Sequence, residues 1–431
     1  MSRVALVYPY FRTRSATELL FPPLGAASLA SQLHALGIET RIFDCTFESF
    51  GGIQKKLRTY HPDIVGIYSM VTLSRNTFRI AEMVRTRLPD SLLVAGGPMP
   101  TLYPERFCAA FDIVFRGEAD LSFPRFCRDF FEQKINRSQL KELPLEIYEG
   151  LFIQQDDLQV GNPLVHYREE QLDSFPLPDR SGFDHSSYQK VWQQQDGSKT
   201  TSLITTLGCP FNCDFCSRPV FGNLFRRRNL DVVFAEIGQI RRLGYDSLWI
   251  ADDNFTLDIN FLREFCRRIA GRKIQWSCLS RVTGIDQEMT GLMKASGCRR
   301  IYLGLETGNE NTLELMKKKA TLEEGKNAVR LFHKAGIDVA AFFIVGYPGE
   351  TIPSIEDTFR FALDLPLDAI SFNVPYPLPG SQLFERVSQV DQTRDWDEEN
   401  EVTFLYESEF DADWLRRRIG ETMRTFAEKK R

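Results

Sequence analysis

Short apolar runs alternate with amphipathic stretches over the first 130 residues of the chain. The apolar runs are typical of strands that a sheet buries on both faces, and the stretches between them have helical spacing. The predicted strands cover residues 4–7, 41–43, 64–68, 92–95 and 113–115, and the predicted helices cover 24–36 and 76–88. Because strands and helices alternate, we expect a parallel sheet with helices on both faces.

The alternation stops at about residue 134 and resumes near residue 203. Residues 134–198 are rich in Gln, Asp, Glu and Pro, which favours a linker or wrapping segment because proline interrupts regular elements. The later predicted strands are 203–206, 247–251, 274–279, 300–305, 339–345 and 369–374, with helices at 234–243, 261–269 and 322–335. Six repeats are too few for a closed eight-stranded barrel, so we expect a partial (β/α)6 barrel with its active site at the carboxyl ends of the strands.

The expected domains are therefore 1–133, a linker at 134–198, 199–383, and a charged tail at 384–431 with a short helix at 414–429. The chain is 43% hydrophobic and 26% charged, and its net charge of −5 argues against a nucleic-acid partner. The amino-terminal MSRVALVYPYF is predicted to be a strand rather than a signal peptide. No stretch approaches the roughly 20 apolar residues that span a bilayer, so we expect a cytoplasmic protein without a membrane partner.

Three of the nine cysteines lie close together in TTLGCPFNCDFCSRP, at Cys209, Cys213 and Cys216. Thiolates are soft ligands that suit iron–sulfur clusters or zinc. A structural zinc site uses four protein ligands, but the nearest later cysteine is Cys266, inside a predicted helix. Three thiolates on a [4Fe–4S] cluster would leave one iron open for another molecule, so a cluster is favoured and a zinc site is the alternative.

This motif resembles that of the radical S-adenosylmethionine (SAM) superfamily, in which CxxxCxxC follows the first strand of a partial barrel. The aromatic Phe215 before the last cysteine also agrees with the family pattern. The resemblance implies that the open iron binds the amino and carboxylate groups of SAM. It also implies that an electron from the cluster cleaves SAM and releases a 5′-deoxyadenosyl radical.

Residues at the ends of four later predicted strands resemble the SAM-binding motifs of the family. Asp252 and Asp253 are expected to bind the SAM amino group, or alternatively to cap the helix that follows. Arg281 is expected to pair with the SAM carboxylate, or to form a surface ion pair. Glu306, in LGLETGNE, is expected near the ribose or methionine end of SAM, and Gly346 near adenine, unless it only forms a turn.

Four segments of the first domain resemble, in order and spacing, the cobalamin (B12)-binding domain found ahead of many radical SAM cores. These segments are FPPLGAASLASQL, HPDIVGIYSMVT, LLVAGGPMPT and FDIVFRGEAD. A ligand of an open α/β sheet lies beyond the carboxyl ends of its strands. The expected cobalamin contacts there are Ser69, Met70, Thr72, Gly96, Gly97, Pro98, Gly117 and Glu118.

One position departs from the pattern of methionine synthase-like cobalamin domains, which carry Asp-x-His-x-x-Gly with a histidine that binds cobalt. Here Thr46 follows Asp44 and Cys45 and stands where that histidine would be. Cobalt would then lack a lower histidine ligand, as is usual in radical SAM methylases. A domain that has lost cobalamin would show the same substitution.

The resemblance implies an α/β chain with a Rossmann-like, flavodoxin-like cobalamin-binding domain, a partial radical SAM barrel and a helical tail. It implies a class B-like methyltransferase that acts on an unactivated carbon of a small metabolite through the deoxyadenosyl radical and methylcobalamin. The implied cofactors are a [4Fe–4S] cluster, SAM and cobalamin, with a reductant such as flavodoxin or ferredoxin. The alternatives are a cobalamin-containing cyclase, oxidase or rearrangement enzyme, a radical SAM enzyme with a vestigial B12 domain, and a non-catalytic iron–sulfur or corrinoid-binding module.

Overall fold

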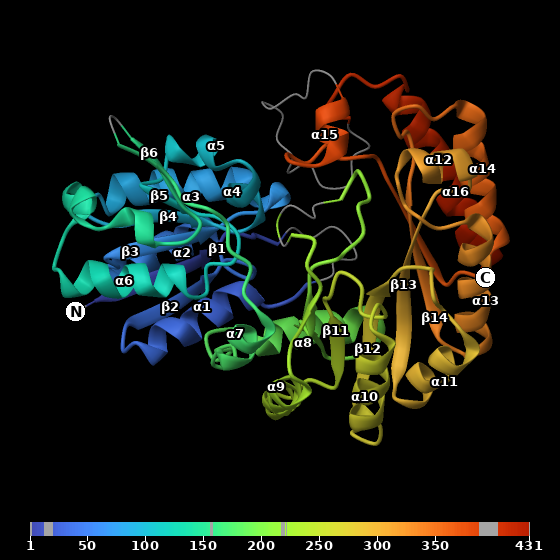
Figure 1. Cartoon of the computed structure of the whole chain (residues 1–431), viewed down its shortest axis with the longest axis horizontal. Helices are drawn as coiled ribbons and strands as arrows, with labels where there is room; N and C mark the ends of the chain where they lie inside the picture. The colour runs from blue at the N-terminus through green and yellow to red at the C-terminus, as the bar shows by residue number, and fades with distance from the viewer. Residues whose placement is uncertain are drawn as a thin grey trace. The chain divides into compact units, whose positions relative to one another are not determined.

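The computed structural model describes residues 2–12, 20–155, 158–216, 220, 222–387 and 404–430. These residues fall into two compact units, and Figure 1 labels most of their helices and many of their strands. The first unit holds the described residues up to 199 together with 231–244, and the second holds the remaining described residues. Within the described parts of the chain, no helix combines the length and the apolar character needed to cross a bilayer.

The first unit is built on a seven-stranded sheet with the order β2-β1-β3-β4-β5-β6-β7. The strands are β1 (Arg3–Tyr8), β2 (Glu39–Asp44), β3 (Ile64–Tyr68), β4 (Leu92–Gly96), β5 (Ile113–Phe115), β6 (Leu151–Gln155) and β7 (Leu158–Gly161). Strands β1 to β5 pair in parallel, as the sequence predicts. Strands β6 and β7 form an antiparallel hairpin on the β5 edge, which was not expected because the Gln, Asp, Glu and Pro content of residues 134–198 favoured a linker.

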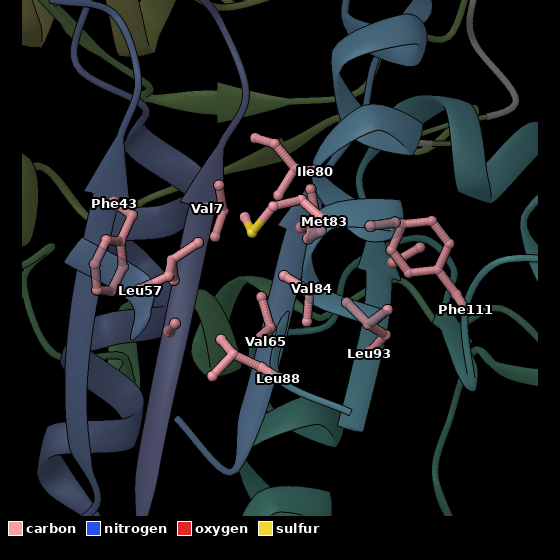
Figure 2. Packing of buried hydrophobic residues seen from close by; sticks show 14 of the residues in the cluster. Val7, Phe43, Leu57, Val65, Ile80, Met83, Val84, Leu88, Leu93 and Phe111 are labelled. Carbon is pink, nitrogen blue, oxygen red and sulfur yellow. The ribbon is translucent and has the colours of Figure 1, made fainter. Parts of the chain in front are cut away.

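Helices cover both faces of this sheet because β1 alternates its buried side chains between them. Val4 and Leu6 pack with α1 and α6, whereas Ala5 and Val7 face α2, α3 and α5. Figure 2 shows the second of these cores, in which Val7 lies among side chains from the neighbouring elements. The helices are α1 (Leu24–Ala35), α2 (Phe50–Tyr60), α3 (Ser74–Arg87), α4 (Pro98–Leu102), α5 (Pro104–Cys108), α6 (Ser122–Glu132), α7 (Glu169–Ser174), α8 (His185–Asp196) and α9 (Leu230–Arg242), with short 3₁₀ helices η1 (Val71–Leu73), η2 (Arg137–Glu142) and η3 (Leu145–Ile147).

The strand order of the first unit reverses between β1 and β3. In doubly wound α/β folds with the order 2-1-3-4-5, ligands bind beyond the carboxyl ends of the strands at this reversal. Tyr8 ends β1 and Tyr68 ends β3, and their ring centroids lie 5.6 Å apart. The fold therefore places the candidate ligand edge beside the segment that begins at Ser69.

The second unit is built on six parallel strands with the order β15-β14-β13-β12-β11-β8. They are β8 (Thr200–Leu203), β11 (Ser247–Ile250), β12 (Gln275–Ser280), β13 (Cys298–Glu306), β14 (Asp338–Ile344) and β15 (Ala369–Asn373). Helices α10 (Ile259–Ile269), α11 (Gln287–Ala295), α12 (Glu310–Leu315), α13 (Leu322–Lys334) and α14 (Ile352–Asp364) alternate with them, and α15 (Gln382–Arg386) follows the last strand. The predicted six βα repeats are confirmed.

The first strand of this series was predicted at the wrong residues. The prediction placed it at 203–206, whereas β8 ends at Leu203 and all four of its residues are buried. Thr200, Thr201 and Ser202 read as polar, although β-branched threonine fits a strand well. Thr206 and Leu207 instead form β9, which pairs antiparallel with β10 (Arg226–Arg227).

The predicted carboxyl-terminal helix is confirmed as α16 (Ala412–Lys429). It packs along α14, and Arg418 Nε donates to Glu356 Oε1 at 2.7 Å. Residues 388–403 of the predicted tail lie outside the described residues. Phe404 and Leu415 join Val345 and Ile355 in one apolar cluster, so the tail completes the core of the second unit.

Candidate functional site

Cys209, Cys213 and Cys216 lie on one loop after β9, called the cysteine loop below. All three cysteines are partly exposed, and Cys216 N donates to Cys213 O at 3.3 Å. Burial raises the pKa of the Cys209 thiol, and Arg281 acts in the opposite direction. The loop thus presents three thiols, and its turn brings the last two back toward each other.

Arg281, directly after β12, lies against this loop. Its Nη1 donates to Cys213 Sγ at 3.3 Å, and its guanidinium lies 3.8 Å from the centroid of the Phe211 ring. Its Nη2 donates to the carbonyl of Lys318. These contacts place a cation directly beside the cysteine loop. The alternative of a surface ion pair is wrong, because the side chain is buried.

The two acidic residues that follow β11 bind the chain that leads into the cysteine loop. Asp252 is buried and accepts hydrogen bonds from Thr205 N at 2.6 Å and from the Thr206 hydroxyl at 2.8 Å. Burial raises the pKa of Asp252 to about 6. Asp253 is exposed, and its Oδ2 accepts from Gly208 N at 3.0 Å. The capping alternative is wrong, because α10 is capped by the side chain of Asp258.

Glu306 ends β13 in a conformation that is unusual for a residue with a side chain. Its φ is 66°, in the left-handed region, where such residues store backbone strain. Its buried carboxylate pairs with the Lys318 ammonium. Lys318 also accepts from Arg281 through its carbonyl, so it joins the end of β13 to the cysteine loop. The role of Lys318 was missed, since a run of three lysines reads as a solvated turn.

Gly346 begins the turn after β14 with φ 77°, and a Cβ there would lie 2.8 Å from Phe404. The tail therefore occupies the side of Gly346 on which a side chain would project. Glu350 closes this turn by accepting from Tyr347 N at 2.8 Å. Burial raises the pKa of Glu350 to about 7. Phe215 packs edge-on against Tyr347, with ring centroids 6.4 Å apart, which joins this turn to the cysteine loop.

The carboxyl edge of the first unit brings Ser69, Gly96 and Gly97 together. Ser69 N donates to Gly96 O at 2.8 Å, and Met99 N donates to Ser69 O at 3.2 Å. Gly97 has φ 107°, and a Cβ there would lie 2.6 Å from Ser69 O. The Ser69 hydroxyl is buried and has no hydrogen-bond partner among the described residues. A buried hydroxyl without a partner costs free energy, and a polar ligand would satisfy it.

The other predicted cobalamin contacts differ in their exposure and in their hydrogen bonds. Met70 and Pro98 are half-buried, and Thr72 is exposed on η1. Gly117 N donates to the Thr101 hydroxyl at 2.8 Å. Glu118 is buried, and its Oε2 accepts from Tyr167 N at 2.9 Å. The carboxylate of Glu118 is thus used in part to hold the chain that follows β7.

Thr46, at the position of the missing histidine, belongs to a buried polar cluster. Its hydroxyl donates to Asp44 Oδ1 at 2.6 Å. The Tyr188 hydroxyl, on α8, lies 2.7 Å from Asp44 Oδ2 and 2.9 Å from the Thr46 hydroxyl. Burial raises the pKa of Asp44. The hydroxyl of Thr46 is therefore bound within the protein.

Within the described residues, no three His, Cys, Asp or Glu side chains gather closely enough to hold one metal ion. A closed structural zinc site takes four protein ligands, whereas the cysteine loop supplies three. In an iron–sulfur cluster each cysteine binds a different iron, so such ligands need not converge on one point. The donor set of three thiols with one cation beside them fits a cluster of that kind.

Comparison with known proteins identifies both halves of the chain. Residues 203–362 match the radical SAM superfamily, and residues 14–126 match the B12 binding domain. An uncharacterized methyltransferase of Pyrococcus horikoshii is 30% identical, over 84% of this chain and 78% of its own length. An anaerobic magnesium-protoporphyrin IX monomethyl ester cyclase of Cereibacter sphaeroides is 27% identical, over 93% of this chain and 66% of its own length.

A solved structure of similar fold is that of TsrM from Kitasatospora setae, a radical SAM methyltransferase with cobalamin and a [4Fe–4S] cluster bound. Its TM-score is 0.74 at 19% identity, over 89% of this chain and 74% of that one. The expected fold class, a B12-binding-type domain followed by a radical SAM domain and a helical tail, is thereby confirmed.

Proposed function

The chain belongs to the radical SAM superfamily and carries a B12-binding domain, and from this premise we propose that it is a cobalamin-dependent methyltransferase acting on an unactivated carbon of a small molecule. The observation that carries the proposal is the presence of two different ligand edges in one chain. One edge has three cysteines with Arg281 beside Cys213. The other has the buried hydroxyl of Ser69, which has no partner among the described residues, next to Gly97.

In this proposal Cys209, Cys213 and Cys216 hold the [4Fe–4S] cluster, and Arg281 donates a hydrogen bond to the Cys213 sulfur. When bound, the cluster and SAM supply a 5′-deoxyadenosyl radical that takes a hydrogen atom from the substrate, and cobalamin supplies the methyl group. The short loop after β11 positions Cys209, because Asp253 holds the amide of Gly208. A protonated amine placed at this exposed carboxylate would gain a charge-assisted hydrogen bond.

Several further side chains are proposed to bind SAM. Asp252 is buried and holds the chain at Thr205 and Thr206, which leads into the cysteine loop. Arg281 and Lys318 place two cations near that loop, and these are proposed to bind the SAM carboxylate. Glu306 is proposed to face the ribose or methionine end, with its backbone strain maintained by the ion pair to Lys318. Phe215 and Gly346 are proposed to border adenine.

The edge of the first unit is proposed to hold the nucleotide tail of cobalamin. Ser69 offers an unpartnered hydroxyl, and Gly97 keeps the backbone of the β4 turn free of a side chain. The remaining predicted contacts, at Met70, Thr72, Gly96, Pro98, Gly117 and Glu118, surround this point. Because the hydroxyl of Thr46 is bound to Asp44 and Tyr188, we propose that this loop gives cobalt no ligand.

A second candidate reaction is ring formation on the same scaffold. The 27% identity to a cyclase over 93% of this chain favours considering it. Both reactions need an electron donor, and we propose a cytoplasmic flavodoxin or ferredoxin. Methyl transfer and ring formation are both compatible with a small-molecule substrate. The two reactions are distinguished by whether the product has gained a methyl group.

The test uses the full chain, purified without oxygen, reconstituted with iron, sulfide and hydroxocobalamin, and desalted. SAM labelled with deuterium in its methyl group is added with a reductant and a set of candidate small molecules. The proposal expects 5′-deoxyadenosine, S-adenosylhomocysteine and a product heavier by one labelled methyl group. A product without the label would support the cyclase, oxidase or rearrangement alternative, and absence of 5′-deoxyadenosine with every candidate would contradict radical chemistry.

A further inference from the structure

The cysteine loop contains a buried charged residue that the proposed function does not use. Asp214 lies between Cys213 and Phe215, and it is 3% exposed. Its Oδ2 pairs with Arg386 Nη2 at 3.0 Å, and its Oδ1 accepts from the Tyr347 hydroxyl. A buried charge costs free energy unless it is paired and hydrogen-bonded, and Asp214 has both kinds of partner.

The backbone of Asp214 is engaged as fully as its side chain. Its N–H donates to Met316 O at 3.1 Å, and its carbonyl accepts from Leu383 N at 2.9 Å. Every polar group of this residue therefore has a partner outside the cysteine loop. A residue bonded in this way fixes both the position and the direction of the chain between the second and third cysteines.

The partners of Asp214 come from three separate parts of the second unit. Met316 follows α12, Tyr347 lies in the turn after β14, and both Leu383 and Arg386 belong to α15. The Arg386 guanidinium also lies 5.3 Å from the centroid of the Tyr347 ring. Asp214 is thus the point at which the cysteine loop, the β14 turn and α15 meet.

We propose that Asp214 is a positioning residue for the iron–sulfur cluster, and that Arg386 and Tyr347 hold it in place from α15 and the β14 turn. It sets the spacing of Cys213 and Cys216, while Arg386 cancels a negative charge that would otherwise lie beside two thiolates. Breaking a buried pair by removing one partner leaves an uncompensated charge, whereas removing both partners does not. The proposal rests on the cluster-binding role assigned to the cysteine loop.

Two single variants distinguish a positioning role of the Asp214–Arg386 ion pair from a general effect on folding. Asp214→Asn removes the buried charge, and Arg386→Gln removes its partner from a position that is 39% exposed, so the second variant is expected to fold. The double variant Asp214→Asn/Arg386→Gln leaves neither charge unpaired. Arg267→Gln is the matched control, because Arg267 pairs with Glu264 at 2.6 Å on the exposed face of α10.

The experiment reconstitutes each full-length variant without oxygen, adds an iron chelator, and follows loss of cluster absorbance together with the electron paramagnetic resonance spectrum of the reduced cluster. We expect each single variant to lose iron severalfold faster than the wild type, and the double variant to lose it more slowly than the product of the two single effects predicts. We also expect opposite shifts in midpoint potential, upward in Asp214→Asn and downward in Arg386→Gln, which a purely structural defect would not produce.

Three outcomes would overturn the proposal. They are wild-type iron loss and spectra in both single variants, independent effects in the double variant, and potential shifts of the same sign in both single variants. If the wild type itself held no cluster, the proposed function would fail instead. If the wild type held the cluster and the variants matched it, only the positioning role would fail.

Discussion

The carboxyl edges of the two parallel sheets are built from different kinds of side chain. In the first unit the turns after β3 and β4 carry the small residues Ser69 and Gly97, which bond mostly through backbone groups. In the second unit the strand ends carry Arg281 and Glu306, which bind other side chains and the cysteine loop. Small residues leave space for a wide ligand, whereas paired charges fix a loop that must hold ligands at set positions.

The difference predicts that a substitution at one edge impairs ligand binding there and leaves ligand binding at the other edge unchanged. The largest effect is expected at the cysteines. Cys213→Ala removes one of three cluster ligands, so iron content and 5′-deoxyadenosine formation should fall to background while cobalamin retention stays unchanged. Iron assay, chromatography of the nucleoside and the visible spectrum after desalting measure the three quantities. Cys108→Ala, at a half-buried thiol of the first unit, is the control. Loss of cobalamin together with iron would show that the edges are not independent.

The next largest effect is expected at the buried ion pair of Glu306 and Lys318 in the second unit. Glu306→Gln leaves the Lys318 ammonium buried without its counter-charge, which costs about 3–5 kcal/mol of unfolding free energy. Urea unfolding of the reduced apoprotein measures the change. Glu288→Gln removes an exposed partner of Arg263 and should cost about 1 kcal/mol or less. Equal losses in the two variants would contradict the importance of the buried pair.

A smaller effect, confined to the first edge, is expected at Gly97. Gly97→Ala places a Cβ 2.6 Å from Ser69 O at φ 107°, so the turn must shift and cobalamin should bind at least severalfold more weakly. Gly37→Ala is the matched control, since Gly37 also has positive φ but open space around it, and its cost is about 1–2 kcal/mol from the backbone alone. Titration with hydroxocobalamin compares the two. A change in iron content in Gly97→Ala would count against separate edges.

The last effect is expected only in a limited pH range. The pKa of Glu350 is raised by burial from its usual 4.5 to about 7, so between these values the folded state binds more protons than the unfolded state. Wild-type stability should therefore fall as pH rises through that window. Relative to the wild type, Glu350→Gln should gain stability from pH 4.5 to 7 and then stay level.

Urea unfolding at several pH values tests this, with Glu323→Gln as the variant of an exposed carboxylate. A difference between Glu350→Gln and the wild type that is constant across the window, or that shrinks as pH rises, would be evidence against the raised pKa.

The sequence predicted the alternating elements well because strands buried on both faces appear as apolar runs, as at Ile64–Tyr68. It misplaced the first strand of the second unit, because Thr200–Leu203 is buried yet mostly polar. The three cysteines were found from their spacing alone. The bonds that fix their loop were not found, because Asp214, Tyr347 and Arg386 are distant in sequence and no motif pairs them with one another.

The most direct measurement is the metal content of the reconstituted, desalted wild-type chain beside that of Cys213→Ala. With one [4Fe–4S] cluster and one cobalamin bound, the wild type should contain about four irons and about one cobalt per chain. The variant should keep its cobalt and lose its iron. A wild type that keeps iron but no cobalt would contradict the cobalamin-dependent function, and one that keeps neither would contradict both ligand edges.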